Sequence, residues 1–96
     1  MGMPITVMGK TQSTGHGCWP PQTLVSGSAN VKINGMPAGR VSDLYTVHCC
    51  MSDCHPGNAA QGSSTVRVNG LPIHRIGDSV SCGGVAATGS PNVFAG

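Results

Sequence analysis

The sequence predicts an all-β domain of short strands and hairpins. Its 96 residues include 15 glycines and 7 prolines, which interrupt the chain every few positions and nearly exclude long helices. Only 8% of the residues are charged and valine recurs throughout, whereas disordered chains combine high net charge with few β-branched residues. In addition, a segment of alternating apolar and polar residues ending in Asn-Gly occurs twice. We therefore expect one small domain spanning residues 1–96.

The repeated segment covers much of the chain. Residues 26–48 realign with residues 61–82, and a third, truncated copy begins at 88–96 after a Gly-rich opening lobe at 6–18. Strands this short cannot bury an apolar face alone, so the copies must pack on one another. We expect internal pseudo-three-fold repetition around a common axis. The residue types shared by the two full copies are Gly27/Gly62, Ser28/Ser63, Val31/Val66, Asn34/Asn69, Gly35/Gly70, Pro37/Pro72, Arg40/Arg75 and Asp43/Asp78.

Each full copy predicts a strand, a tight turn, a returning strand and a second turn. Residues 31–33 and 66–68 alternate with period two and lead into Asn-Gly, the strongest short hairpin signal, so two type I′ turns are expected. The returning strand starts at a proline, whose missing N–H suits a strand start. An arginine and an aspartate then follow, three residues apart. We interpret them as structural pairs that fix the second turn: Arg40 with Asp43, and Arg75 with Asp78.

The stretch VHCCMSDCH concentrates side chains that bind metals. Zinc is usually held by four Cys or His ligands in a tetrahedron, and one loop often supplies two of them. His48 and His55 lie on either side of a turn-forming segment and can supply such a pair. The Gly-flanked segments 15–18 (GHGC) and 79–84 (SVSCGG) are the candidate sources of two more. Pseudo-three-fold repetition favours this hypothesis, because equivalent turns around an axis meet.

Other interpretations of the same residues stay open. A Cys–His catalytic pair at Cys49 or Cys50 lacks an oriented third group. His74 is interpreted as a surface or hydrogen-bonded histidine, and Trp19 as a plug beneath a loop rather than a protein-binding patch. Five cysteines also fit two disulfides and a spare thiol, although the lack of a signal-peptide pattern argues against oxidative folding. The partners in that case, or else buried thiols, are Cys18, Cys49, Cys50 and Cys54.

Charge and hydropathy exclude two classes of partner. The net charge of +2 comes from five scattered basic residues and three acids, so no basic stripe exists to neutralise nucleic-acid phosphates. No apolar run approaches the roughly 20 residues that span a bilayer. The N-terminus also lacks a charged region followed by an apolar region. We expect synthesis in the cytoplasm without a signal peptide, and no nucleic-acid partner.

The motifs as a whole resemble the PAAR-repeat proteins of bacterial type VI secretion systems. The resemblance is carried by NGMPAGRVSD and NGLPIHRIGD with GS-x-x-V ahead of each, by GHG near the start, SCGG after the second copy and a closing GSPNVFAG. It covers essentially the whole chain. The name-giving Pro-Ala-Ala-Arg is Pro-Ala-Gly-Arg at 37–40 and Pro-Ile-His-Arg at 72–75, so His74 stands where the family usually has alanine.

The resemblance implies a fold, a metal and a partner. The fold is a small cone whose broad base caps a trimeric valine-glycine-repeat spike protein, one copy per trimer. Such a protein is not an enzyme; it sharpens the spike for membrane puncture, meets the target-cell membrane only transiently, and can attach effector proteins. Export is through the type VI secretion system. One structural zinc at the tip is implied, with four ligands carried over onto this sequence: His16, His48, His55 and Cys82.

Two alternative functions belong to other classes. A disulfide-stapled small secreted binding module would have bonded cysteines and no zinc. A zinc hydrolase would keep an open coordination position beside a carboxylate base. Asp53 is the one acid near the candidate ligands, and the sequence contains no glutamate.

Overall fold

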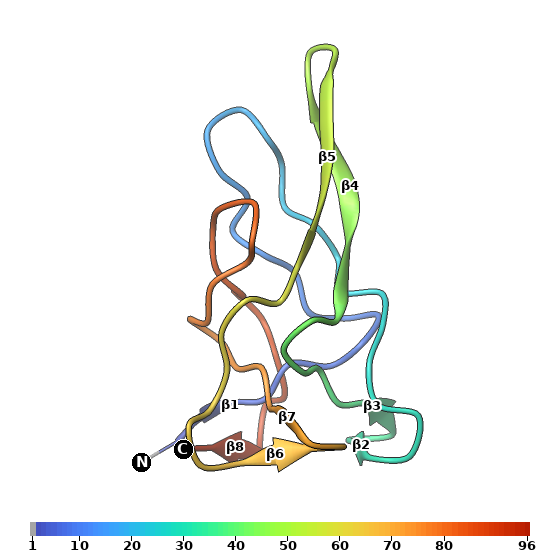
Figure 1. Cartoon of the computed structure of the whole chain (residues 1–96), viewed down its shortest axis with the longest axis vertical. Coiled ribbons are helices and arrows are strands. Elements are labelled where there is room, and N and C mark those ends of the chain that lie inside the picture. The colour runs from blue at the N-terminus through green and yellow to red at the C-terminus, as the bar shows by residue number, and fades with distance from the viewer. Residues whose placement is uncertain (1) are drawn as a thin grey trace.

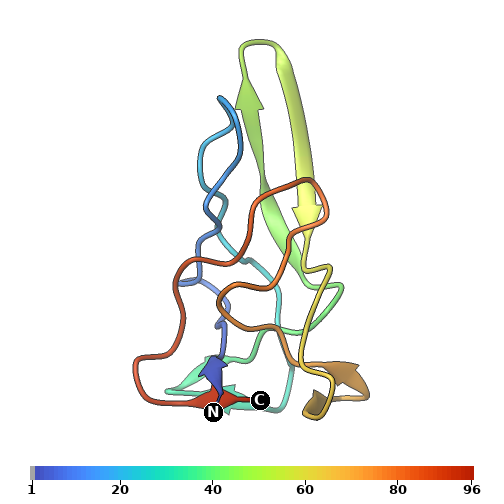
Figure 2. The same ribbon diagram turned by 90° about the vertical axis from the view of Figure 1, so that its left-hand side faces the viewer.

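The computed structural model describes residues 2–96 and shows a narrow cone with extents of 37 × 26 × 22 Å. Three pairs of two-residue strands form the broad base, one of them made from the two ends of the chain, and one long hairpin rises to the tip (Figures 1 and 2). The described residues contain no helix, so the all-β prediction is confirmed. The strands are β1 (Met3–Pro4), β2 (Lys32–Ile33), β3 (Met36–Pro37), β4 (Leu44–Cys50), β5 (Asp53–Asn58), β6 (Arg67–Val68), β7 (Leu71–Pro72) and β8 (Phe94–Ala95).

Both predicted Asn-Gly hairpins are present at the base. β2 pairs with β3 and β6 pairs with β7, each antiparallel. The turn residues have positive φ at both positions, 54° and 81° at Asn34 and Gly35, and 55° and 79° at Asn69 and Gly70. Type I′ turns require this conformation, which asparagine and glycine adopt at the lowest cost. The type I′ prediction is therefore confirmed.

The third base hairpin is assembled from the two ends of the chain. β8 pairs with β1 so that Phe94 faces Pro4, the register in which Lys32 faces Pro37 in the first copy. Residues 88–96 were expected to be a truncated copy, and the second strand of this copy was not predicted. The missing strand is preceded by a recognisable signal, because Gly2-Met3-Pro4 repeats the Gly-Met-Pro of residues 35–37. The pseudo-three-fold repetition is thus complete at the base.

Three backbone hydrogen bonds close a ring on the pseudo-three-fold axis. The amide of Gly39 donates to Thr6, that of Thr6 to His74, and that of His74 back to Gly39, at 2.9–3.0 Å. These three residues occupy equivalent positions in the three copies. The space between them is filled unequally, because His74 and Thr6 are fully buried and a Cβ on Gly39 would overlap Thr6 Oγ1. The large side chain of His74 and the smaller one of Thr6 therefore fill the space on the axis, and Gly39 leaves room for them.

Buried serines link each copy to the next. In every copy the hydroxyl of a serine accepts the backbone N–H groups two and three residues ahead. The same hydroxyl then donates to the neighbouring copy: Ser28 to Asn69, Ser90 to Asn34, and Ser63 to the carbonyl of Gly96. The hairpin-turn asparagines therefore also hold the copies together.

The predicted Arg–Asp pairs fix the turns of two copies. Arg40 donates through Nε and Nη2 to the carboxylate of Asp43, at 3.0 Å each, and Arg75 binds Asp78 in the same way. Each aspartate also accepts the backbone N–H of its arginine. In the third copy the hydroxyl of Thr11 accepts the N–H of Val7 at 2.8 Å. A neutral hydrogen bond there replaces the ion pair.

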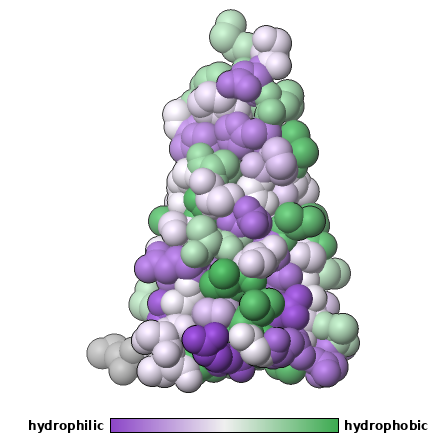
Figure 3. Space-filling model, viewed as in Figure 1, coloured by the Kyte–Doolittle hydropathy of each residue, from purple (hydrophilic) through white to green (hydrophobic). Residues whose placement is uncertain are grey.

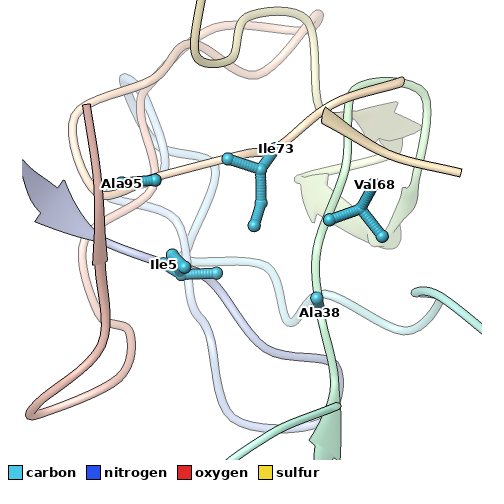
Figure 4. Close-up of a cluster of buried hydrophobic side chains, with 5 residues drawn as sticks. All are labelled: Ile5, Ala38, Val68, Ile73 and Ala95. Carbon is cyan, nitrogen blue, oxygen red and sulfur yellow. The ribbon is translucent and has the colours of Figure 1, made fainter. Parts of the chain in front are cut away.

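Apolar side chains are buried in two small clusters. The lower cluster joins the three copies near the base (Figure 4) and consists of Ile5, Ala38, Val68, Ile73 and Ala95. The upper cluster lies beneath the tip and consists of Leu24, Tyr45, Ala59 and Val80. The outer surface seen in Figure 3 narrows steadily and mixes hydrophilic with hydrophobic residues. No helix of residues 2–96 is long and apolar enough to cross a membrane.

His74 is hydrogen-bonded, as the sequence analysis expected, but it is fully buried. Its Nδ1–H donates to the carbonyl of Gln61 at 2.8 Å, and its Nε2 accepts the hydroxyl of Tyr45 at 2.9 Å. Both contacts suit a neutral imidazole. Burial lowers the pKa of His74 from its usual value of 6.5, because the charged form is penalised away from water.

Folding stability is expected to fall as pH drops below the unfolded pKa of His74, about 6.5. The unfolded chain takes up a proton there, whereas the lowered pKa keeps the folded imidazole neutral. The contribution is therefore fully present above pH 6.5 and is lost progressively below it. Urea unfolding between pH 7.5 and 5.5 gives the free energy of unfolding at each pH. This free energy should fall more steeply with decreasing pH in the wild type than in His74→Ala. Equal slopes would contradict this assignment.

Candidate metal centre

Three loops rise from the base and converge near the tip. They cover residues 11–24, 44–59 and 79–86, and each starts at the turn that ends one copy. Their converging side chains come from distant parts of the sequence and offer ligand atoms that all lie within 4.8 Å of one another: His16, His48, His55 and Cys82. These are the four residues that the sequence analysis named as ligands.

Local structure explains why these four side chains meet. His48 in β4 lies directly opposite His55 in β5, so their rings project from the same face of the hairpin. His16 sits in a tight turn bridged to Trp19. Cys82 precedes Gly83 and Gly84, which have φ of 120° and 77°. Side chains rarely adopt these angles, and a Cβ on Gly83 would press on the His16 ring at 3.1 Å.

The donor set fits a tetrahedral zinc ion. The Nε2 atom of His55 lies 3.1 Å from that of His16 and 2.7 Å from that of His48, and Cys82 Sγ lies 3.8 Å from His48 Nε2. Zinc–nitrogen bonds of about 2.0–2.1 Å place two ligand nitrogens about 3.3 Å apart at the corners of a tetrahedron. The His16–His55 spacing is close to this value, and three imidazoles with one thiolate are ligands that zinc prefers.

Neighbouring groups orient two of the ligands. His48 is buried, and its Nδ1–H donates to the carbonyl of Pro20 at 2.6 Å, which leaves Nε2 free to face the cluster. Such outer hydrogen bonds fix the tautomer of metal-binding histidines. Cys82 lies against Gly57, where a Cβ would be 2.7 Å from its sulfur. The fully buried Gln22 contacts the same sulfur at 3.3 Å.

The protonation state of His16 also suits a metal ligand. Burial, and then the nearby imidazoles of His48 and His55, lower the pKa of His16 from 6.5, so the ring is held in the neutral form that binds metals. Among residues 2–96 no carboxylate joins the four ligand atoms. Four protein ligands would fill a tetrahedron, whereas a zinc hydrolase keeps an open position beside a carboxylate base.

Trp19 covers one side of the cluster. Its ring stacks on that of His16 with centroids 5.0 Å apart and lies 5.1 Å from that of His55. Its Nε1–H donates to the carbonyl of Asp53 at 3.1 Å, which ties the first loop to the β4–β5 hairpin. The sequence analysis interpreted this residue as a plug beneath a loop, and the half-buried ring instead shields the ligand histidines.

Trp19 is therefore expected to report on the metal. It is the single tryptophan of the chain, so protein fluorescence excited near the indole band arises from this ring. Removing the metal with a chelator should shift its emission to longer wavelength, because His16 and His55 separate and the indole gains water. His48→Ala should show the shifted spectrum without chelator. A spectrum that is the same before and after chelation would contradict this arrangement.

The remaining cysteines form two disulfides. Cys18 bonds to Cys50, and Cys49 bonds to Cys54 across the β4–β5 hairpin, whereas Cys82 is free. Of the two states left open by the sequence, disulfides are therefore present. The alternative of buried thiols is not found, and Cys18, Cys49 and Cys54 are exposed. Cys49 and Cys54 lie on the β4–β5 hairpin, and Cys18 lies in the loop that carries His16.

His74 lies outside the cluster. It contacts Tyr45 and Gln61 on the axis and is not among the residues whose ligand atoms converge. The histidine that replaces the family's usual alanine therefore packs on the pseudo-three-fold axis and is not a candidate ligand.

A comparison with family models identifies the chain. The model of the PAAR motif matches residues 14–88 of the 96 residues. The chain belongs to the PAAR-motif family. The matched range includes both full copies and all four candidate ligands. PAAR-motif proteins form the structural spike tips of type VI secretion systems. A search of curated proteins found no match.

Proposed function

We propose that this PAAR protein is a zinc-stapled cap on the spike of a type VI secretion system. The observation that carries the proposal is the convergence of four ligand atoms from three loops within 4.8 Å. His16, His48, His55 and Cys82 hold one zinc ion. The ion joins loops that share few apolar contacts, because the upper cluster contains only four buried residues.

The role of the metal is mechanical rather than catalytic. Structural zinc contributes about 10–16 kcal/mol in small peptides, which is comparable to the roughly 5–15 kcal/mol that stabilises a whole domain. Bonds from the three loops to one centre prevent them from splaying under load. The β4–β5 hairpin extends beyond this centre, and Met51 in its turn is 97% exposed. The chain itself catalyses no reaction, so any toxic activity belongs to separately encoded effectors.

The base is the surface that binds the spike. Three hairpins of equal register surround the axis, so one chain offers three similar contacts to a trimer. Exposed apolar side chains of these hairpins and their flanks, Met3, Val66 and Phe94, can be buried there. The spike is a trimeric valine-glycine-repeat protein bound by one copy of this chain. The complex leaves the cytoplasm through the secretion system and meets the target membrane only during puncture.

Binding to the cognate spike is expected at one chain per trimer. Light scattering of the purified complex measures this stoichiometry. Phe94→Asp should weaken binding, since it places a charge on β8 in the base. Leu44→Asp is the matched control, because Leu44 is equally exposed but belongs to the upright β4. Three chains per trimer, or no complex, would overturn the proposed function.

A further inference from the structure

Two of the disulfide cysteines lie beside two of the proposed ligands. Cys18 follows His16 by two positions, and Cys50 follows His48 by two positions. His48 and Cys50 lie two apart in β4 and therefore project from the same face, whereas Cys18 lies in the tight turn that begins at His16. The disulfide between Cys18 and Cys50, with Cα atoms 5.5 Å apart, therefore joins the two segments that carry these histidines, one step closer to the tip.

The second disulfide lies within one hairpin. Cys49 faces Cys54 in β4 and β5, and the neighbouring pair in the ladder is His48 and His55. Adjacent residues of a strand point to opposite faces, so Cys49 and Cys50 cannot turn their sulfurs to one centre. The four cysteines therefore form two separate disulfides on two faces and not a four-thiolate metal site.

We propose that the Cys18–Cys50 disulfide is a positioning element that couples metal binding at the tip to the redox state of the protein. This inference rests on the proposed zinc centre. The turn carrying His16 is joined to the hairpin by this disulfide, by the Trp19–Asp53 hydrogen bond and by the hydrogen bond between Pro20 and His48, and the disulfide is the covalent link among them. With the disulfide reduced, His16 must be ordered when the metal binds, and that ordering weakens binding. With the disulfide formed, His16 is already opposite His48 and His55.

The coupling acts in both directions. If disulfide formation raises the affinity for zinc by a given factor, zinc raises the equilibrium constant for disulfide formation by the same factor. The redox step is exchange with a small disulfide such as oxidised glutathione. The thiols of Cys18 and Cys50 plus one glutathione disulfide yield the protein disulfide and two glutathione thiols. A cap made with reduced cysteines would thus tighten its metal centre on reaching an oxidising compartment.

The Cys49–Cys54 disulfide provides an internal control. It spans five positions within strands that already pair through hydrogen bonds, and the facing histidines are aligned by that pairing. The Cys18–Cys50 disulfide spans 32 positions and joins separate loops. Only the Cys18–Cys50 disulfide is expected to affect metal affinity strongly.

Zinc affinity is measured by competition with a chromophoric chelator. The oxidised wild type is compared with C18S/C50S and C49S/C54S, whose serines supply no thiolate. Groups that orient metal ligands typically change affinity by about 10–100-fold, and we expect a loss of this size in C18S/C50S. The loss in C49S/C54S should stay below about threefold.

A reciprocal measurement needs no variant. Wild-type protein is equilibrated in glutathione buffers with and without zinc, and the Cys18–Cys50 disulfide is quantified by alkylation and mass spectrometry. Zinc should make this disulfide form at a more reducing glutathione ratio. The coupling would be overturned by equal zinc affinities of the wild type and C18S/C50S, or by an equal loss of affinity in both serine variants. It would also be overturned if zinc shifted disulfide formation to more oxidising glutathione ratios. Each of these results would leave the zinc centre in place. Failure of every form to bind zinc would overturn both.

Discussion

His48→Ala is expected to abolish zinc retention and to open the tip. His48 is the most buried of the four proposed ligands, with 4% of its surface exposed, and it faces both His55 and Cys82. Its loss leaves three ligands and removes the hydrogen bond to Pro20. The free energy of unfolding at saturating zinc should fall by several kcal/mol, a substantial part of the roughly 10–16 kcal/mol that structural zinc supplies in small peptides.

The measurement combines metal analysis with urea unfolding. His55→Ala should behave like His48→Ala. His74→Ala is the matched control, because it also removes a buried imidazole but one that lies on the axis away from the cluster. It should retain one zinc per chain and lose stability only through the cavity and the unpaired groups of Tyr45 and Gln61, about 2–4 kcal/mol. Zinc loss in His74→Ala with retention in His48→Ala would show that the ligand assignment is wrong.

Gly39→Ala is expected to destabilise the fold strongly, although it adds a single methyl group. The added Cβ would overlap Thr6 Oγ1 and lie 2.8 Å from Leu24 Cδ2. Gly39 also donates and accepts backbone hydrogen bonds in the ring around the axis, so the backbone cannot move away without breaking it. Overpacking of this kind costs about 1–3 kcal/mol. Because the ring of backbone hydrogen bonds holds Gly39 in place, we expect a loss of unfolding free energy near the upper end of this range.

A second substitution tests the physical cause. Thr6→Ala removes the hydroxyl that the new methyl would meet, so the double variant Thr6→Ala/Gly39→Ala should lose less stability than the sum of the two single variants. Gly35→Ala is the control for backbone effects. It lies at a positive φ of 81° but has nothing within 4 Å of its Cβ position, so Thr6→Ala should not rescue it. Additive effects of Thr6→Ala and Gly39→Ala in urea unfolding would contradict steric overlap on the axis.

Local chemistry made the base hairpins and the ligand set predictable from the sequence. Asn-Gly at residues 34–35 and 69–70 has a specific turn preference, and His48 and Cys82 each follow shortly after the aspartate that ends a copy, Asp43 and Asp78. The metal cluster then follows from three loops around one axis. The position of His16 required the family resemblance, because its loop carries no copy of the Arg–Asp pair: Val7 and Thr11 stand in place of the two charges.

Long-range pairing explains what the sequence did not reveal. The third hairpin joins Met3 to Ala95, and its local signal, the Gly-Met-Pro at residues 2–4, does not indicate which distant strand it pairs with. The cysteine pairing had several possible connectivities, and only the fold brings Cys18 opposite Cys50. The burial of His74 depends on Gly39 and Thr6 leaving space on the axis, a relation among three copies that no single copy contains.

X-ray absorption at the zinc edge of the purified, oxidised protein tests the central claim most directly. We predict one zinc per chain bound by three nitrogen ligands at about 2.0–2.1 Å and one sulfur ligand at about 2.3 Å, from His16, His48, His55 and Cys82. Two or more sulfur ligands would mean that one or more of the cysteines assigned here to disulfides bind the metal in place of these histidines. That result, or protein that takes up no zinc, would contradict a zinc-stapled tip.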